Sequence, residues 1–170
     1  MEFKELAKKR YSSRDLSGGK PEKEKLDNII ETAIIAPTAV NKQPFKIFVM
    51  ESERAKEVIH EVTKFTFGAE TFLVVAADPD QGWVRKYDGK NFADVDATIV
   101  ATHIMLEIED QGLNTTWVGH FNAPLLKENF PEMKDYELIA IFPIGYKGPE
   151  GEASERHEQR KTREELVEVL

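Results

Sequence analysis

The sequence predicts a layered α/β or α+β fold, in which helices pack around one sheet. Amphipathic helical patterns alternate with short apolar runs of strand length along the chain. No internal repeat appears, and no linker is long enough to separate two domains. The 170 residues are 41% hydrophobic and 32% charged. That is a globular composition, and it suits one compact domain over residues 1–170.

Helical spacing dominates the first 36 residues. Apolar residues at i, i+3 and i+4 predict a short helix over 3–9. A second helix is expected with Pro21 in its first turn, where a missing N–H costs nothing, and it runs to about Ala36. Pro37 disfavours helical backbone in the residue before it, so the helix should end there. Residues 37–45 are then expected to form a loop.

The next segment alternates between strand and helix. Residues 46–50 have strand character, and residues 53–65 predict a third amphipathic helix. The continuous apolar run 72–77 predicts a strand covered on both faces. Residues 78–90 are polar and contain Pro and Gly, so they predict a loop.

The second half begins with the longest helical pattern, residues 92–111. Gly112 is expected to stop it from the position just after the cap. The acidic side chains near its end, Glu107, Glu109 and Asp110, are expected to form a solvated face. The remaining expected elements are a strand over 115–118, a short helix over 124–129, a strand over 138–144, a loop over 145–154 and a final helix over 163–170.

Composition excludes several functions. No Cys is present, which removes disulfides, thiolate metal sites and cysteine nucleophiles. The four His have no HxH or HExxH spacing, so no metal site is expected. A net charge of −8 argues against nucleic-acid binding. The charged start lacks the apolar core of a signal peptide, and no run approaches the ~20 apolar residues of a membrane span. A cytoplasmic protein without membrane or nucleic-acid partners is expected.

Two basic segments are candidate phosphate sites. Arg10 and Arg14 stand four residues apart with hydroxyl side chains between them, and their forked donors suit a phosphate. Arg160 and Lys161 precede the last expected helix and can serve the same purpose. Each segment alone fits a solvated surface equally well.

Two further segments suit a flat ligand. Residues 36–45 contain small residues that permit close approach, and the amides of Asn41 and Gln43 can both donate and accept. Gly119 follows an expected strand, where the absent side chain exposes a backbone N–H. The alternatives are an ordinary helix-to-strand connection and an ordinary turn.

Together, in this order and spacing, these segments resemble the nitroreductase family of FMN-dependent oxidoreductases over essentially the whole chain. Residues 9–14 are similar to the family's Arg-x-Ser-x-Arg/Lys motif, and 36–45 to its Pro-Ser-x-x-Asn-x-Gln-Pro-Trp segment. Residues 94–119 resemble its central helix and following strand, and 143–146 its Pro-Val-Gly-Tyr strand. The departures are Thr-Ala in place of Ser-Ser or Ser-Ala, Phe in place of Trp, and a short 78–91 segment. The resemblance implies a homodimeric three-layer α-β-α sandwich around a mostly antiparallel sheet.

The resemblance also implies roles for individual residues. The FMN phosphate and ribityl chain would be held by Arg10, Tyr11, Ser12 and Arg14, with Arg160 or Lys161 reaching the same phosphate. The partner subunit would supply Pro37, Thr38, Ala39 and Asn41. The flavin ring would lie against Val118 and Gly119, with the Gly119 N–H near N5. Trp83 and Phe45 are candidates for the substrate face.

The implied activity is transfer of hydride from NADH or NADPH to FMN and onward to a nitroaromatic, quinone or similar small acceptor, by ping-pong kinetics. No side chain is expected to be catalytic, since the cofactor carries the difficult step. The alternatives are a non-catalytic FMN-binding or FMN-sensing protein and a specialised flavin-dependent dehydrogenase of the same fold. The sequence does not distinguish NADH from NADPH.

Overall fold

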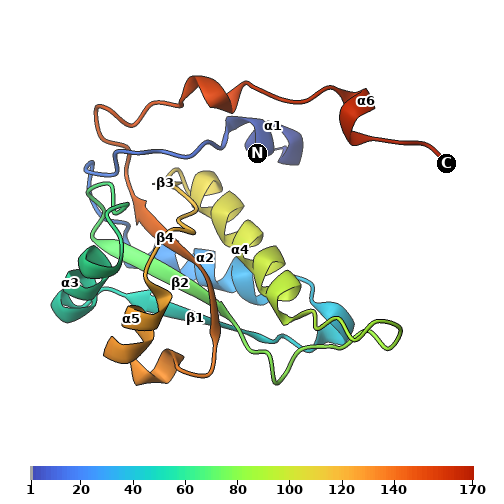
Figure 1. Cartoon of the computed structure of the whole chain (residues 1–170). Coiled ribbons are helices and arrows are strands. Elements are labelled where there is room, and N and C mark those ends of the chain that lie inside the picture. The colour runs from blue at the N-terminus through green and yellow to red at the C-terminus, as the bar shows by residue number, and fades with distance from the viewer. Residues whose placement is uncertain (1) are drawn as a thin grey trace.

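The computed structural model describes residues 2–170. Its central feature is a four-stranded antiparallel sheet in the order β1-β2-β4-β3 (Figure 1). The strands are β1 (Phe45–Met50), β2 (Thr71–Ala77), β3 (Asn114–Thr115) and β4 (Glu137–Gly145). The α-helices are α1 (Phe3–Lys9), α2 (Lys23–Ile34), α3 (Glu53–Val62), α4 (Ala93–Asp110), α5 (Ala123–Asn129) and α6 (Arg163–Leu166). Short 3-10 helices are η1 (Ala39–Asn41), η2 (Pro131–Met133) and η3 (Glu155–His157).

Strand β2 is buried at every residue because helices cover both faces of the sheet. Successive side chains of a strand point to opposite faces. Leu73 and Val75 pack with α2 and α4, whereas Phe72 and Val74 pack with α3 and α5. The expected strand 72–77 and its burial are therefore confirmed, and the fold is α+β with three layers.

The end of α4 follows the prediction in detail. Gly112 has φ 72°, a left-handed conformation that a residue without Cβ adopts at low cost. Its N–H donates to Glu109 O at 3.0 Å, and the Leu113 N–H donates to Ile108 O at 3.0 Å. This pair of bonds is the Schellman arrangement, which satisfies carbonyls at the helix end.

Four expected boundaries are wrong. Pro21 lies outside α2, because Glu22 is extended and its carboxylate accepts the Tyr146 hydroxyl at 2.7 Å. Helix α3 ends at Val62, because the next residue turns into extended backbone. Strand β3 covers Asn114–Thr115, so only Thr115 of the expected 115–118 strand lies in it, and Val118 forms an isolated bridge with Ile141. The final helix ends at Leu166, and the segment beyond it lies away from the body of the molecule (Figure 1).

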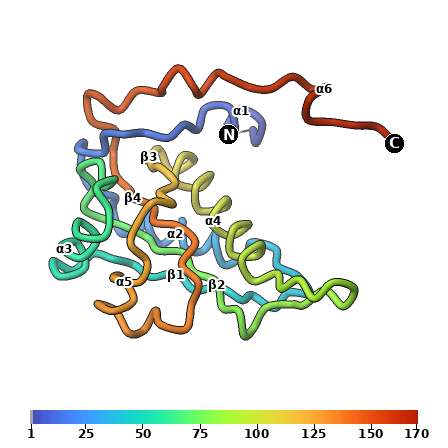
Figure 2. The backbone as a smooth tube through the Cα atoms, viewed as in Figure 1, coloured from blue at the N-terminus to red at the C-terminus, as the bar shows by residue number. Residues whose placement is uncertain are grey.

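The expectation of a solvated face at the end of α4 is also wrong for Glu109. That side chain is 5% exposed, and its carboxylate forms an ion pair with Lys9 Nζ at 3.0 Å. The pair attaches α1 to α4. The segment that follows α1 crosses the top of the sheet beside the chain after β4 (Figure 2).

Candidate functional site

Two distant segments of the chain form one small cavity of about 220 Å³, the arginine cavity. It contains five of the six residues expected at the phosphate, and Lys161 is exposed and does not line it. The lining residues are Arg10, Tyr11, Ser12, Arg14, Ser154, Arg156, His157 and Arg160. Since η3 supplies two of them, residues more than 140 positions apart meet at one cationic surface.

The charges in this cavity favour an anionic ligand. Burial lowers the pKa of the Arg10 guanidinium, Glu109 opposes this shift, and Arg160 adds to it. Arg10 and Arg160 both line the cavity, and the positive charge of Arg160 disfavours the charged form of Arg10. An anion between them relieves that repulsion and accepts forked hydrogen bonds from both.

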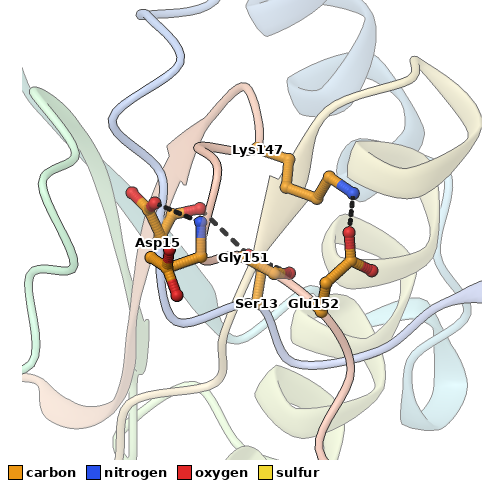
Figure 3. A network of polar contacts seen from close by, with 6 residues as sticks. Ser13, Asp15, Lys147, Gly151 and Glu152 are labelled. Carbon is orange, nitrogen blue, oxygen red and sulfur yellow. Dashed lines mark hydrogen bonds and ion pairs between the residues drawn. The ribbon is translucent and has the colours of Figure 1, made fainter.

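A polar clasp holds the two segments together (Figure 3). The Ser13 hydroxyl lies 3.1 Å from both the Asp15 and the Gly151 carbonyl oxygens. The Asp15 carboxylate accepts the Glu150 N–H at 3.0 Å, and the Asp15 carbonyl accepts the Gly148 N–H at 3.1 Å. The hydrogen bonds of the carboxylate, above all from the Ser17 hydroxyl, lower the pKa of Asp15. Residues 13–15 and 148–151 are therefore fixed side by side, next in sequence to the segments that carry the cationic side chains.

A second cavity of about 210 Å³, the aromatic cavity, adjoins the first. Arg14 lines both. The other lining residues are Phe65, Phe67, Thr116, Trp117, Val118, Gly119 and His120. The Thr116 hydroxyl donates to Ser13 O at 2.8 Å, so the clasp also fixes the wall of this cavity. A cation-rich cavity next to an aromatic one suits a flat ring with a phosphate tail.

Gly119 presents an open backbone surface to the aromatic cavity. Val118 pairs with Ile141 in both directions, at 3.0 Å each, whereas the Gly119 N–H has no backbone partner among residues 2–170. A Cβ placed on Gly119 would meet no atom within 4 Å. The glycine therefore leaves space above the backbone for a ligand.

The segment with Pro37, Thr38, Ala39 and Asn41 lines neither cavity. It surrounds η1, at the opposite side of Figure 1 from the clasp. Within it, Val40 has φ 47°, Asn41 φ 56° and the nearby Gln43 φ 52°. Left-handed backbone is costly for a β-branched residue, and such strain concentrates at functional sites.

Hydrogen bonds maintain this strained segment. The Ala39 N–H donates at 2.9 Å to Asp96, which is 2% exposed on α4. The Gln43 N–H donates to the Thr38 hydroxyl at 3.0 Å. The second carboxylate oxygen of Asp96 is buried without a hydrogen-bond partner among the described residues.

Neither candidate substrate residue reaches the two cavities within one chain. Trp83 packs edge-on against Phe92, with ring centroids 5.2 Å apart. Phe45 is partly buried at the start of β1 and packs on the core under α2 and α4. Both lie in the same part of the fold as η1.

Comparison with known proteins identifies the fold and the family. A model of the Nitroreductase family matches residues 7–146. The chain belongs to the nitroreductase family. A nitroreductase family protein from Clostridium difficile 630 is 37% identical, with a TM-score of 0.91 over 99% of this chain and 98% of that one.

Other relatives of this nitroreductase family member are more distant. An Archaeoglobus fulgidus protein with the provisional name NADH dehydrogenase/NAD(P)H nitroreductase is 26% identical over 146 residues, covering 80% of this chain and 77% of its own. A structure from Exiguobacterium sibiricum in complex with FMN has a TM-score of 0.82 at 22% identity, over 100% of this chain and 98% of that one. At that identity the likeness shows the fold.

Sequence reasoning missed several residues of this nitroreductase-family site. Ser13 lies within the expected phosphate segment, but its fully buried hydroxyl serves the clasp rather than a cavity, and no local pattern indicates this role. Arg156 belongs to the basic cluster before α6, but the sequence around it does not indicate that it lines the arginine cavity. The ring of His157 contacts Lys8 O at 3.1 Å, a long-range contact without a sequence signal. Phe65 and Phe67 also line the aromatic cavity, although neither belongs to a segment that the sequence analysis assigns to the site.

Neither a metal-ligand cluster nor a membrane-spanning helix is found among residues 2–170. Among residues 2–170, no three side chains of the metal-binding types are grouped as a metal ion would require. Within the same residues, no helix is both long enough and apolar enough to cross a membrane.

Proposed function

We propose that this protein is an FMN-dependent oxidoreductase that takes hydride from NADH or NADPH and passes electrons to a nitroaromatic, quinone or similar small acceptor. The observation that carries the proposal is the junction of the arginine and aromatic cavities at Arg14. The first cavity suits a phosphate dianion and the second suits a flat ring. The family and the FMN complex of a protein with the same fold support this choice.

The residues present fit FMN. The phosphate would accept from Arg10, the Ser12 hydroxyl and Arg160, with Lys161 contributing from just outside the cavity and Tyr11 through its backbone. The flavin ring would lie on Val118 and Gly119, beside the aromatic wall of the second cavity. Arg14 lines both cavities, so it would serve the ribityl chain and the near edge of the ring.

FMN, when bound, would supply the redox chemistry: it accepts a hydride and passes electrons on singly or in pairs. This chain's residues bind and orient the cofactor and stabilise charge. The free Gly119 N–H would donate to the ring, and the guanidinium of Arg14 would stabilise negative charge on the reduced ring. No acid or base side chain is required, because water can supply the protons.

The proposed enzyme is a homodimer in which the partner subunit supplies Pro37, Thr38, Ala39 and Asn41. The strained backbone of this segment and its separation from the cavities of its own chain support that assignment. Trp83 and Phe45 would reach the partner's substrate face by the same route.

Exposed apolar side chains also support association. Val40 is 71% exposed on η1, and Val169 is 89% exposed in the segment after α6. Further exposed side chains of this kind are Ile34, Ile35, Leu166, Val167 and Leu170. Exposed apolar side chains at positions 34–40 and 166–170 favour burial against a second copy of the chain.

The test of catalysis starts from purified protein with FMN added. The bound flavin should bleach with NADH or NADPH under anaerobic conditions and regain its colour with a quinone over many turnovers. A protein that stays colourless after FMN is added contradicts the proposal. A protein that binds FMN but is not bleached is a binding or sensing protein.

The dimer is tested by mass measurement in solution. The full chain should have twice its 19.4 kDa mass, and a truncated chain that ends at Thr162 should dissociate at higher concentration. If the full-length chain is a monomer and still retains FMN through gel filtration, the role assigned to residues 37–41 is contradicted.

A further inference from the structure

A third hollow of about 490 Å³, the outer cavity, continues from the arginine cavity. The two share Arg14, Ser154 and Arg156, and Glu155 and Gln159 complete the lining of the outer cavity. The outer cavity is therefore an extension of the proposed phosphate site.

The arginine cavity holds more positive charge than one phosphate can neutralise. Four guanidinium groups line it: Arg10, Arg14, Arg156 and Arg160. A phosphate monoester carries a charge of about −1.5 to −2 at neutral pH. The outer cavity adds one carboxylate, that of Glu155, so positive charge is still in excess when both are counted. In a chain whose net charge is −8, such a concentration of cations indicates a second anionic group.

Arg156 is the cation best placed for that second group. Arg10 and Arg160 line the arginine cavity but not the outer cavity. Arg156 instead lines both cavities. No ion pair or hydrogen bond engages its side chain among residues 2–170, so its guanidinium fork is available to a ligand.

We propose that Arg156, together with Ser154, forms a second phosphoryl subsite beside Arg14, and that this subsite takes the phosphate of an adenosine-containing dinucleotide. The inference rests on the proposed function, which places the FMN phosphate in the arginine cavity. Gln159 can donate and accept at once, which matches the edge of adenine. The Glu155 carboxylate can accept hydroxyl groups of a ribose. The outer cavity thus offers polar partners for each part of an adenosine phosphate.

Two sources contain this chemistry. The first is the adenylate half of FAD, whose second phosphate would follow the flavin phosphate without a break. The second is the adenylate half of NADH or NADPH. The experiment separates them with one variant, Arg156→Gln, and one matched control, Arg163→Gln, an exposed arginine on α6 that lines none of the three cavities.

The first measurement is the dissociation constants of FMN and FAD, from flavin fluorescence, in the wild type and both variants. If FAD is the source, Arg156→Gln weakens FAD binding by about tenfold or more, the worth of one charge-assisted hydrogen bond. FMN binding then changes less than about threefold on the same scale. The second measurement is KM for NADH and NADPH with FMN bound. If the pyridine nucleotide is the source, that KM rises by a similar factor while both flavin affinities are retained.

Three results would overturn the subsite. Arg156→Gln and Arg163→Gln could behave alike in all assays, or Arg156→Gln could leave every constant unchanged. Alternatively, FMN and FAD could lose equal affinity, which would place Arg156 on the first phosphate. These results leave the wild-type affinity for FMN intact, so they are distinct from failure of the proposed function, in which the wild type binds no flavin. That last result would remove both proposals.

Discussion

Replacing Ser13 with Ala tests the clasp that brings the two halves of the arginine cavity together. Ser13 is fully buried, and its hydroxyl lies 3.1 Å from two carbonyl oxygens, those of Asp15 and Gly151. A hydroxyl has one proton, so the two acceptors share it. After the substitution, the Asp15 carbonyl still accepts the Gly148 N–H, whereas the buried Gly151 carbonyl loses its partner.

The magnitude follows from that orphaned acceptor. A buried polar group left without its hydrogen bond costs about 1–3 kcal/mol. For a chain of this length, each kcal/mol lowers Tm by about 2–4 °C. Ser13→Ala should therefore lower the Tm of the apoprotein by roughly 2–12 °C on the same scale. FMN affinity should also fall, since Arg14 and the η3 segment are no longer held in register.

Ser12→Ala is the matched control, because its hydroxyl lines the arginine cavity and takes no part in the clasp. Thermal melts of the apoproteins and FMN titrations of both variants separate the two roles. Ser12→Ala should weaken FMN binding with little change in apoprotein Tm. An unchanged Tm for Ser13→Ala, or equal losses of Tm in the two variants, would refute the assignment of the clasp to Ser13.

Three other expectations follow from the same geometry. Arg10→Ala combined with Arg14→Ala should abolish FMN retention through gel filtration, since each charge-assisted contact contributes about 1.5–3 kcal/mol; retention by the double variant would reject the phosphate assignment. Gly148→Ala should lower both Tm and FMN affinity, because its Cβ would overlap the Asp15 carboxylate. Tyr146→Phe should alter the pH dependence of Tm. The Tyr146 hydroxyl lowers the pKa of Glu22, so its contribution is present above the ordinary carboxyl pKa and is lost as the pH falls through the lowered one. The variant should therefore melt below the wild type near pH 7 and converge with it in acid; a constant difference would contradict this origin.

The local sequence pattern was sufficient to predict elements whose burial follows directly from their run of apolar residues. The uninterrupted apolar run of β2 predicts a strand covered on both faces, and the structure has helices on both. Gly112 predicts the end of α4 because few residues other than glycine adopt the left-handed backbone that ends a helix. The resemblance of four ordered segments to one family was also confirmed by the family match.

Local patterns failed where a distant contact decides the outcome. Thr63 ends α3 in extended backbone, and its hydroxyl donates to His120 O at 2.9 Å, a contact 57 residues away. Glu109 is buried because Lys9 of another helix neutralises it. The apolar spacing after Thr162 is helical, yet beyond Leu166 those side chains have nothing to pack against within the described chain, and the helix ends.

The same limit applies to the site. Arg10 and Arg14 are recognisable from their spacing, but their meeting with Arg156 and Arg160 depends on the clasp. The left-handed backbone at Val40 has no sequence signal at all, because a β-branched residue predicts the opposite.

The construction of the arginine cavity has a consequence for biosynthesis. One wall comes from residues 10–14 and the other from 154–160, so the last strand of the sheet, which ends at Gly145, is synthesised before the second wall of the cavity. A phosphate-bearing cofactor can be captured only after residue 160 has emerged and the clasp has closed. Loading is thus a late step, and a bound cofactor then opposes reopening by mass action. Limited proteolysis within residues 150–160 should accordingly be slow in the loaded protein and fast in the empty one.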